Sequence, residues 1–220
     1  MENETIFVLL AGGKSERMGV DKGLLKYKHT FWILEQLNRI SKTSIKTVYI
    51  GLGYNSQHYL DAISWLNDSL INSVDYQGTK IRTFVNPTPE LGSFSTLQTV
   101  LKNINSDCDV LINPIDVPLL NSDELNKIIA VKNNIVMPNF EGKNGHPIKM
   151  AASFWQKLVS LNIAEENSRL DLQIKKLNVK EISIIKVNDA SVTKNLNTKT
   201  AWVSYLNEEK KLIEPSKTTA

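Results

Sequence analysis

LAGGKSERMGVDKGLL, residues 10–25, is the most informative segment of the chain. It follows the apolar run Ile6–Leu10, which is long enough for one buried strand of a parallel sheet. An Ala-Gly-Gly turn comes next, and its two missing side chains allow backbone N–H groups to approach a ligand closely. The cations Lys14, Arg17 and Lys22 then follow within nine residues. This combination suits a polyphosphate ligand, and the alternative is an ordinary strand-to-helix turn with solvated cations.

The turn matches neither of the two common phosphate-binding motifs. A P-loop ending at Gly13-Lys14-Ser15 would need a glycine where the chain has Val8. The dinucleotide fingerprint also fails, because Gly51-Leu52-Gly53 lacks its third glycine at Ser56. The sequence therefore predicts a phosphate-binding loop of another type.

Composition places the chain among globular proteins. Its 220 residues are 41% hydrophobic and 22% charged, which predicts one domain over residues 1–208, followed by a polar tail at 209–220. A net charge of +3 is too small to indicate a nucleic-acid partner. With no signal peptide and no apolar run near the roughly 18 residues of a membrane span, we expect a cytoplasmic location and no membrane. The single cysteine, Cys108, excludes an intrachain disulfide and is expected to be buried.

Apolar periodicity indicates alternating strands and helices. This alternation predicts an α/β fold in three layers, a mostly parallel sheet flanked by helices, with ligands at the carboxyl ends of the strands. The predicted strands are 6–10, 46–51, 80–85, 109–112, 135–137 and 181–187. The predicted helices are 30–40, 56–66, 95–104, 122–130, 153–160, 168–177 and 198–206, and either Ser122 or Asp123 is expected to cap the fourth of them.

A second informative segment carries an isolated acid. Residues 109–119 form a strand that runs into a loop where Pro114 and Pro118 stiffen the backbone around Asp116. A fixed carboxylate at a strand end can hold Mg²⁺, which needs only one or two protein oxygens in addition to water and substrate phosphates. The alternative is that Asp116 serves a turn or a helix cap.

LAGGKSERMGVDKGLL and INPIDVPLL together resemble the signature segments of the nucleotidyltransferases with a glycosyltransferase-A-like α/β fold. Within that group the chain most resembles the molybdenum-cofactor guanylyl- and cytidylyltransferases. The resemblance implies that Leu10, Ala11, Gly12 and Gly13 wrap a nucleotide. It further implies that Arg17 and Lys22 bind its phosphates as catalytic residues, and that Asp116 binds Mg²⁺.

Later segments carry the resemblance further. Asn86-Pro87 and the Ser-rich stretch after Gly92 resemble a cytidylyltransferase segment, which implies nucleotide binding by Asn86, Ser93 and Ser95. Because both serines precede an apolar periodic helix, helix capping is their alternative role. Gly145-His146-Pro147 resembles a segment that lines the acceptor side in the cytidylyl branch, so His146 is expected to contact the acceptor.

The C-terminal match contains a departure from the family pattern. Asn195-Leu196-Asn197-Thr198 falls where relatives have Asp-Ile-Asp-Thr, whose second acid is a further metal ligand. Asn197 still offers a carbonyl oxygen, but it removes one negative charge and so weakens the expected hold on Mg²⁺. Two alternatives remain: Asn197 only caps the last helix, or Asp189 takes the place of the second ligand.

The resemblance implies transfer of a nucleotidyl group from a nucleoside triphosphate to a phosphorylated small molecule, which is expected to be molybdopterin, with release of pyrophosphate. The glycine loop resembles the guanylyl branch and the later segments resemble the cytidylyl branch, so CTP is favoured only weakly over GTP. A protein that receives the product is a further expected partner. The alternatives are transfer to a sugar phosphate or another phosphorylated metabolite, and a degenerate nucleotide-binding protein that keeps the fold.

Overall fold

The computed structural model describes residues 4–213, and its centre is the strand β1 (Thr5–Ala11). On either side of β1 lie β4 (Thr47–Leu52) and β7 (Asp109–Pro114), both parallel to it. Alternate residues of a strand point to opposite faces, and nearly all of β1 is buried, so it contributes apolar side chains to both sides of the sheet. The continuous apolar run at 6–10 is thus explained by burial on two faces.

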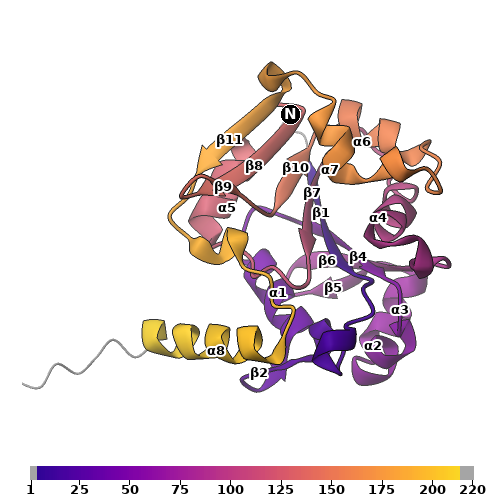
Figure 1. Cartoon of the computed structure of the whole chain (residues 1–220). Coiled ribbons are helices and arrows are strands. Elements are labelled where there is room, and N and C mark those ends of the chain that lie inside the picture. Colours follow the sequence, from indigo (N-terminus) through magenta and orange to yellow (C-terminus); the bar gives the residue numbers. More distant parts are fainter. Residues whose placement is uncertain (1–3, 214–220) are drawn as a thin grey trace, which may run out of the picture.

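The main sheet has nine strands and is mostly parallel, as predicted (Figure 1). From one edge to the other the order is β11 (Ile182–Lys186), β8 (Ile135–Phe140), β10 (Ile148–Met150), β7, β1, β4, β6 (Thr79–Val85) and β5 (Val74–Tyr76), with β9 (Lys143–Asn144) paired to β8. The short strands β5, β9 and β10 are antiparallel to their neighbours and were not predicted. Two more short strands, β2 (Lys26–Tyr27) and β3 (Thr30–Phe31), form a separate hairpin.

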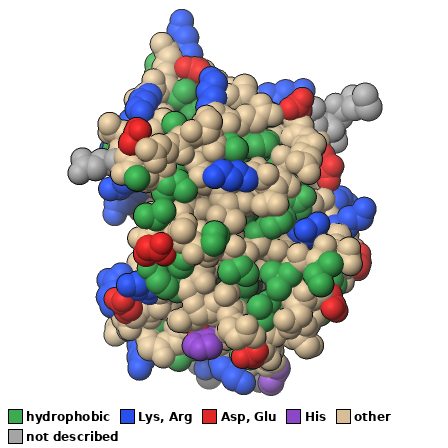
Figure 2. All heavy atoms as spheres, turned by 90° about the vertical axis from the view of Figure 1, so that its right-hand side faces the viewer, with side chains coloured by type: hydrophobic (Ala, Val, Ile, Leu, Met, Phe, Trp, Pro, Cys, Tyr) green, Lys and Arg blue, Asp and Glu red, His purple; other side chains and the backbone are tan. Residues whose placement is uncertain are grey.

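Helices cover both faces, which confirms the three layers (Figure 1). One apolar core contains Phe7 and Leu9 of β1 and side chains from α1 (Trp32–Ser41), α2 (Ser56–Ala62), α3 (Trp65–Ile71), α5 (Ser122–Ala130) and α8 (Lys199–Ile213). The other contains Ile6 and Val8 and side chains from α4 (Ser93–Leu101), α6 (Ala152–Val159) and α7 (Leu170–Lys175). Figure 2 shows apolar side chains gathered across the middle of the face that lies on the right-hand side of Figure 1. Cys108 is buried in the second core, as expected.

Three helix expectations need correction. The helix expected over 56–66 is two helices, α2 and α3, because the chain leaves helical geometry at Ile63. The cap of α5 is Asn121, whose side chain accepts a hydrogen bond from Glu124 N, and not Ser122 or Asp123. The last helix continues to Ile213, so residues 209–213 of the expected tail are helical, and 214–220 lie outside the described residues. Over residues 4–213, none of the helices is both long and apolar enough to cross a membrane.

Candidate active site

A cavity of about 1070 Å³ opens at the carboxyl ends of β1 and β7. Its lining combines the glycine turn, the Lys22 loop and the Asp116 loop with side chains from α4, α7 and the β9–β10 region. The lining residues are Leu10, Ala11, Gly12, Gly13, Ser15, Lys22, Tyr59, Leu91, Gly92, Ser93, Phe94, Thr96, Leu97, Ile112, Pro114, Ile115, Asp116, Met137, Asn144, Gly145, His146, Ile148, Arg169, Leu170, Asp171, Ile174 and Lys175. Ligands of open α/β sheets bind at this end of the strands.

The backbone of the glycine turn packs closely against Thr96 and Gly53. A Cβ atom on Gly12 would lie 2.5 Å from Thr96 Oγ1, and one on Gly53 would lie 2.5 Å from the Gly12 carbonyl oxygen. Tyr54 N donates to that same carbonyl at 3.2 Å. Gly13 differs, since a Cβ there would meet nothing within 4 Å. Gly12 therefore serves close packing, whereas Gly13 leaves the backbone open toward the cavity.

The structure brings Lys22, Asp116 and Asn197 together. The Lys22 ammonium donates to Asp116 Oδ2 at 2.9 Å and to Asn197 Oδ1 at 2.5 Å. The Lys22 and Asp116 side chains are 17% and 19% exposed, so the pair is partly shielded from water and still reachable from the cavity. Three segments far apart in the sequence thus place one cation and two oxygens at a single point.

The loop that carries Lys22 is fastened to its surroundings on both sides. Lys22 N donates to Ser15 Oγ at 3.2 Å, and Gly23 N donates to the Tyr59 hydroxyl at 3.1 Å. Burial raises the pKa of Tyr59, so its hydroxyl stays protonated while it accepts this bond. Asp21, only 5% exposed, accepts from Asn55 Nδ2 at 2.9 Å and lies 2.7 Å from His58 Nδ1. These contacts tie the lysine loop to α2.

Arg17 does not lie with Lys22 and Asp116. It belongs to the short 3-10 helix Glu16–Met18, its side chain is exposed, and it is not among the residues that line the cavity. The neighbouring Met18 takes the interior position and is 1% exposed. Because adjacent residues of this turn point in different directions, burying Met18 sends the Arg17 side chain to the surface.

Of the three residues predicted to bind the nucleotide beyond the glycine turn, only Ser93 lines the cavity. Asn86 and Ser95 are 3% and 1% exposed, and Asn86 Nδ2 donates to Ser95 Oγ at 2.6 Å. Ser95 Oγ also donates to the Gly92 carbonyl at 2.7 Å. Their hydrogen-bonding groups are engaged in holding the first turn of α4. Neither serine caps the helix as the alternative had it, because the N-cap is Gly92 and both serines lie within α4.

His146, which was predicted to contact the acceptor, lines the cavity. Burial lowers the pKa of His146, while the nearby Asp116 carboxylate acts in the opposite direction. The backbone N–H of His146 donates to the Val192 carbonyl at 3.2 Å. A Cβ atom on the preceding Gly145 would collide with that same carbonyl oxygen, so only glycine fits there. The segment is therefore held closely against the C-terminal part of the chain.

Several cavity residues were missed by the sequence reasoning. Tyr59 belongs to the predicted helix 56–66, and Phe94 to the segment after Gly92, where only the serines were assigned a role. Arg169, Asp171 and Lys175 belong to the predicted helix 168–177, which carries no motif. Only tertiary packing brings α7 to the cavity. Asp189, the alternative metal ligand, instead caps a turn: its carboxylate accepts from Ser191 N at 2.9 Å and from Asn121 N at 3.3 Å.

Known proteins resemble this chain both in sequence and in structure. A molybdenum cofactor guanylyltransferase of Xanthomonas euvesicatoria is 30% identical over 123 residues, which is 56% of this chain and 52% of that protein. The matched region therefore spans about half the length of that relative. Among solved structures, a nucleotidyl transferase from Methanothermobacter superposes with a TM-score of 0.75 at 15% identity, covering 96% of this chain and 99% of that one.

A second solved structure, Rv0371c from Mycobacterium tuberculosis, superposes with a TM-score of 0.71 at 17% identity and covers 94% of this chain and 100% of that chain. The same Mycobacterium protein has been solved in complex with manganese, with a TM-score of 0.66. At these identities the structural likeness establishes the fold alone. The model of the MobA-like NTP transferase domain matches residues 7–177, more than three quarters of the sequence. The chain belongs to the MobA-like NTP transferase family.

Proposed function

We propose that this protein transfers a nucleoside monophosphate from CTP or GTP to the terminal phosphate of molybdopterin and releases pyrophosphate. The observation that carries the proposal is the contact of Lys22 with Asp116 and Asn197, because Lys22 and Asp116 line the same cavity as the glycine turn. The relative from Xanthomonas, a molybdenum cofactor guanylyltransferase, supports molybdopterin as the acceptor.

The chemistry follows from charge and position. The acceptor phosphate attacks the α-phosphorus, a new P–O bond forms, and the bond to pyrophosphate breaks, so no covalent enzyme intermediate is needed. Lys22 stabilises the negative charge that develops on the α-phosphate and on the leaving pyrophosphate. Asp116 and Asn197 hold the ammonium of Lys22, which lines the same cavity as the glycine turn, so that its position is set before substrate binds.

The donor set is compatible with a divalent cation. The Lys22 ammonium occupies the point where Asp116 Oδ2 and Asn197 Oδ1 converge, so a Mg²⁺ ion would bind beside it, through the other carboxylate oxygen of Asp116. Residues 4–213 contain no cluster of three or more His, Cys, Asp or Glu side chains that could hold a metal. A Mg²⁺ ion beside the ammonium would take one or two protein oxygens and complete its shell with water and triphosphate oxygens, a composition that Mg²⁺ accepts. When bound, it supplies neutralisation of triphosphate charge. The manganese complex of the Mycobacterium protein supports this assignment.

Base selection is assigned to the segment at Gly92 and Ser93. Both line the cavity at the start of α4, and Ser93 is exposed there with its hydroxyl free to approach a base or ribose. Asn86 and Ser95 act indirectly in this proposal, since they hold the backbone that presents Ser93. The resemblance of this segment to the cytidylyl branch makes CTP the weakly preferred donor.

Pyrophosphate release with each of the four nucleoside triphosphates, with and without molybdopterin, tests the proposal. We expect release with CTP or GTP only when molybdopterin and Mg²⁺ are present. Release with a sugar phosphate in place of molybdopterin would move the protein to the alternative class of acceptor. Nucleotide binding without release for any acceptor would identify a degenerate nucleotide-binding protein.

A further inference from the structure

The loop that carries Asp116 is fixed to α1 on both sides of the carboxylate. Trp32 Nε1 donates to the Ile115 carbonyl at 2.7 Å, and Leu119 N donates to Gln36 Oε1 at 3.1 Å. Trp32 and Gln36 are four residues apart on α1, so they lie on the same face of the helix. Both side chains are fully buried. The position of Asp116 is therefore tied to α1.

The C-terminal segment meets the same loop from the other side. Leu196 N donates to the Asp116 carbonyl at 2.8 Å, and the next residue, Asn197, accepts from Lys22. Both residues lie beyond residue 177, where the match to the family model ends. A part of the chain outside the matched region thus supplies one of the two acceptors of the lysine ammonium.

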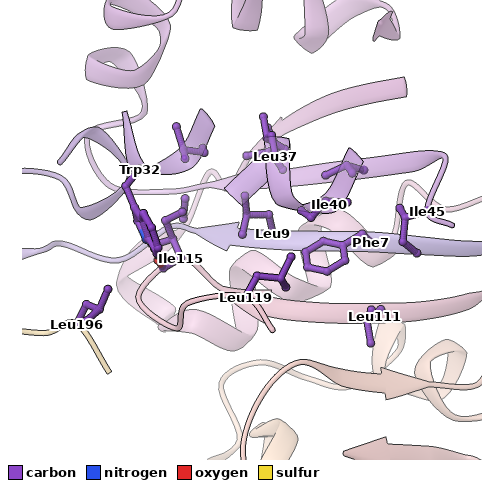
Figure 3. Close-up of a cluster of buried hydrophobic side chains, with 14 of the residues drawn as sticks. Phe7, Leu9, Trp32, Leu37, Ile40, Ile45, Leu111, Ile115, Leu119 and Leu196 are labelled. Atoms are coloured by element: carbon purple, nitrogen blue, oxygen red, sulfur yellow. Dashed lines mark hydrogen bonds between the residues drawn. The ribbon is translucent and has the colours of Figure 1, made fainter. Parts of the chain in front are cut away.

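Trp32 also anchors the helix that follows this segment. Its ring centroid lies 5.3 Å from that of Trp202 and 5.4 Å from that of Tyr205, both in edge-on arrangements. Figure 3 shows Trp32 beside Ile115, with Leu196 close by. The cluster is closed by the Arg39–Glu209 ion pair at 2.8 Å, with the Arg39 guanidinium 5.5 Å from the Trp32 ring. One buried indole therefore contacts the Asp116 loop and the helix that begins two residues after Asn197.

We propose that Trp32 is a positioning residue: through the Ile115 carbonyl and the Trp202–Tyr205 surface it sets Asp116 and Asn197 on either side of the Lys22 ammonium. Trp32 does not line the cavity, so it acts through these two residues and not on a ligand. The restraint on Lys22 is a property of the protein alone. Only its kinetic consequence rests on the proposed nucleotidyl transfer.

The chain provides a matched control for this proposal. Trp155 is 2% exposed, and its Nε1 donates to the Cys108 carbonyl at 2.9 Å. Cys108 directly precedes β7, whereas Ile115 directly follows it. Trp32→Phe and Trp155→Phe therefore remove equivalent buried hydrogen bonds at opposite ends of one strand, and only the first is near Lys22.

The test is competitive acetylation of the folded protein with acetic anhydride, with the Lys22 peptide quantified by mass spectrometry relative to that of the exposed Lys127. An ammonium held by two acceptors reacts slowly, so we expect Trp32→Phe to raise the Lys22 rate roughly two- to tenfold, the effect of loosening one hydrogen bond. Trp155→Phe should leave the Lys22 rate unchanged while lowering the unfolding temperature to a similar extent. An unchanged Lys22 rate in folded Trp32→Phe, or an equal rise in both variants, would overturn the proposal.

A second variant covers the case in which Trp32→Phe does not fold. Trp202→Phe keeps the indole of Trp32 but weakens its packing against α8, and it should raise the Lys22 rate relative to Trp155→Phe; no rise would overturn the proposal. In parallel, pyrophosphate release should slow in Trp32→Phe and not in Trp155→Phe. If the wild-type protein released no pyrophosphate with any acceptor, the proposed function would fail, and the acetylation result would still decide the role of Trp32.

Discussion

At the scale of single residues, the Lys22 ammonium connects the segments of the candidate site. Lys22 has two side-chain acceptors, Asp116 and Asn197, that come from distant parts of the chain. Asn197 carries no negative charge, but its side-chain oxygen accepts a hydrogen bond from the Lys22 ammonium. Preorganised cations of this kind stabilise charge that develops during phosphate transfer, because they need little rearrangement when the reaction occurs.

We expect Lys22→Ala and Asp116→Ala each to lower turnover by on the order of 10²–10³ while the fold survives. Neither side chain is fully buried, so removing it costs little packing. Steady-state pyrophosphate release measures the first effect, and thermal unfolding measures the second. Lys127→Ala, which removes an exposed lysine of α5, is the control and should change neither. Near-wild-type rates in folded Asp116→Ala would contradict the proposed role of the carboxylate.

His146 gives a prediction for the dependence of stability on pH. Burial lowers the pKa of His146 in the folded state, whereas in the unfolded chain the imidazole titrates near pH 6.5. As the pH falls below about 6.5, the unfolded state takes up a proton that the folded state resists, so stability present above this pH is lost. Between pH 7.5 and pH 5.5, the free energy of unfolding measured by urea denaturation should therefore fall more for the wild type than for His146→Gln. Equal decreases in the two proteins would show that burial of the His146 imidazole does not contribute to the dependence of stability on pH.

At the scale of elements, the antiparallel strand β10 brings a buried lysine to the end of α5. Lys149 is 2% exposed, and its ammonium donates to the carbonyls of Ile129 and Val131 at 2.6 and 2.8 Å. It also pairs with Asp109 Oδ2 at 2.9 Å. The last carbonyls of a helix have no partner within the helix, and a cation placed there satisfies them. This contact joins α5 to the centre of the sheet.

Lys149→Met should lower the free energy of unfolding by about 2–4 kcal/mol, because it keeps most of the apolar stem but leaves two carbonyls and a partly buried carboxylate without their partner. Urea denaturation measures the change. Asp109→Asn is the companion variant: it keeps the two carbonyl bonds and should cost less. A loss below that of Asp109→Asn would mean that the carbonyl contacts contribute little.

At the scale of the whole molecule, the cavity lies where the two apolar cores meet the carboxyl edge of the sheet. The glycine turn, the Asp116 loop, α4, α7 and the segment after β9 all reach it. No single element encloses the cavity, so its shape depends on the docking of all of them. Ligand binding to such a site stabilises the whole fold, because only the folded chain has the cavity.

We expect CTP with Mg²⁺ to raise the unfolding temperature more than GTP with Mg²⁺. At a hundredfold excess over the dissociation constant, one bound ligand adds ~2.7 kcal/mol, which is several degrees for a chain of this size. Differential scanning fluorimetry measures the shift, and the same nucleotides without Mg²⁺ should give smaller shifts. Equal shifts for all four triphosphates would contradict selection of the base at Gly92 and Ser93, and a larger shift with GTP would reverse the weak preference for CTP.

Much of the arrangement followed from local pattern alone. The apolar run at 6–10, the glycine turn and the proline-flanked Asp116 each indicate a strand end, and parallel strands bring their carboxyl ends to one edge. That is why Lys22 and Asp116 could be expected in one cleft. The main strands and helices followed in the same way, because their apolar spacing matches the period of each element and the faces it buries.

What local pattern leaves open is the direction of individual side chains and the contacts between distant segments. Arg17 points to the surface because Met18 occupies the interior, and Asn86 and Ser95 bond to each other instead of facing the cavity. Packing between residues far apart in the sequence produces the short antiparallel strands, the position of α7 at the cavity and the contacts of Trp32 with the Asp116 loop. Periodicity and motifs report on neighbours along the chain, whereas these features depend on which surfaces meet once the layers have assembled.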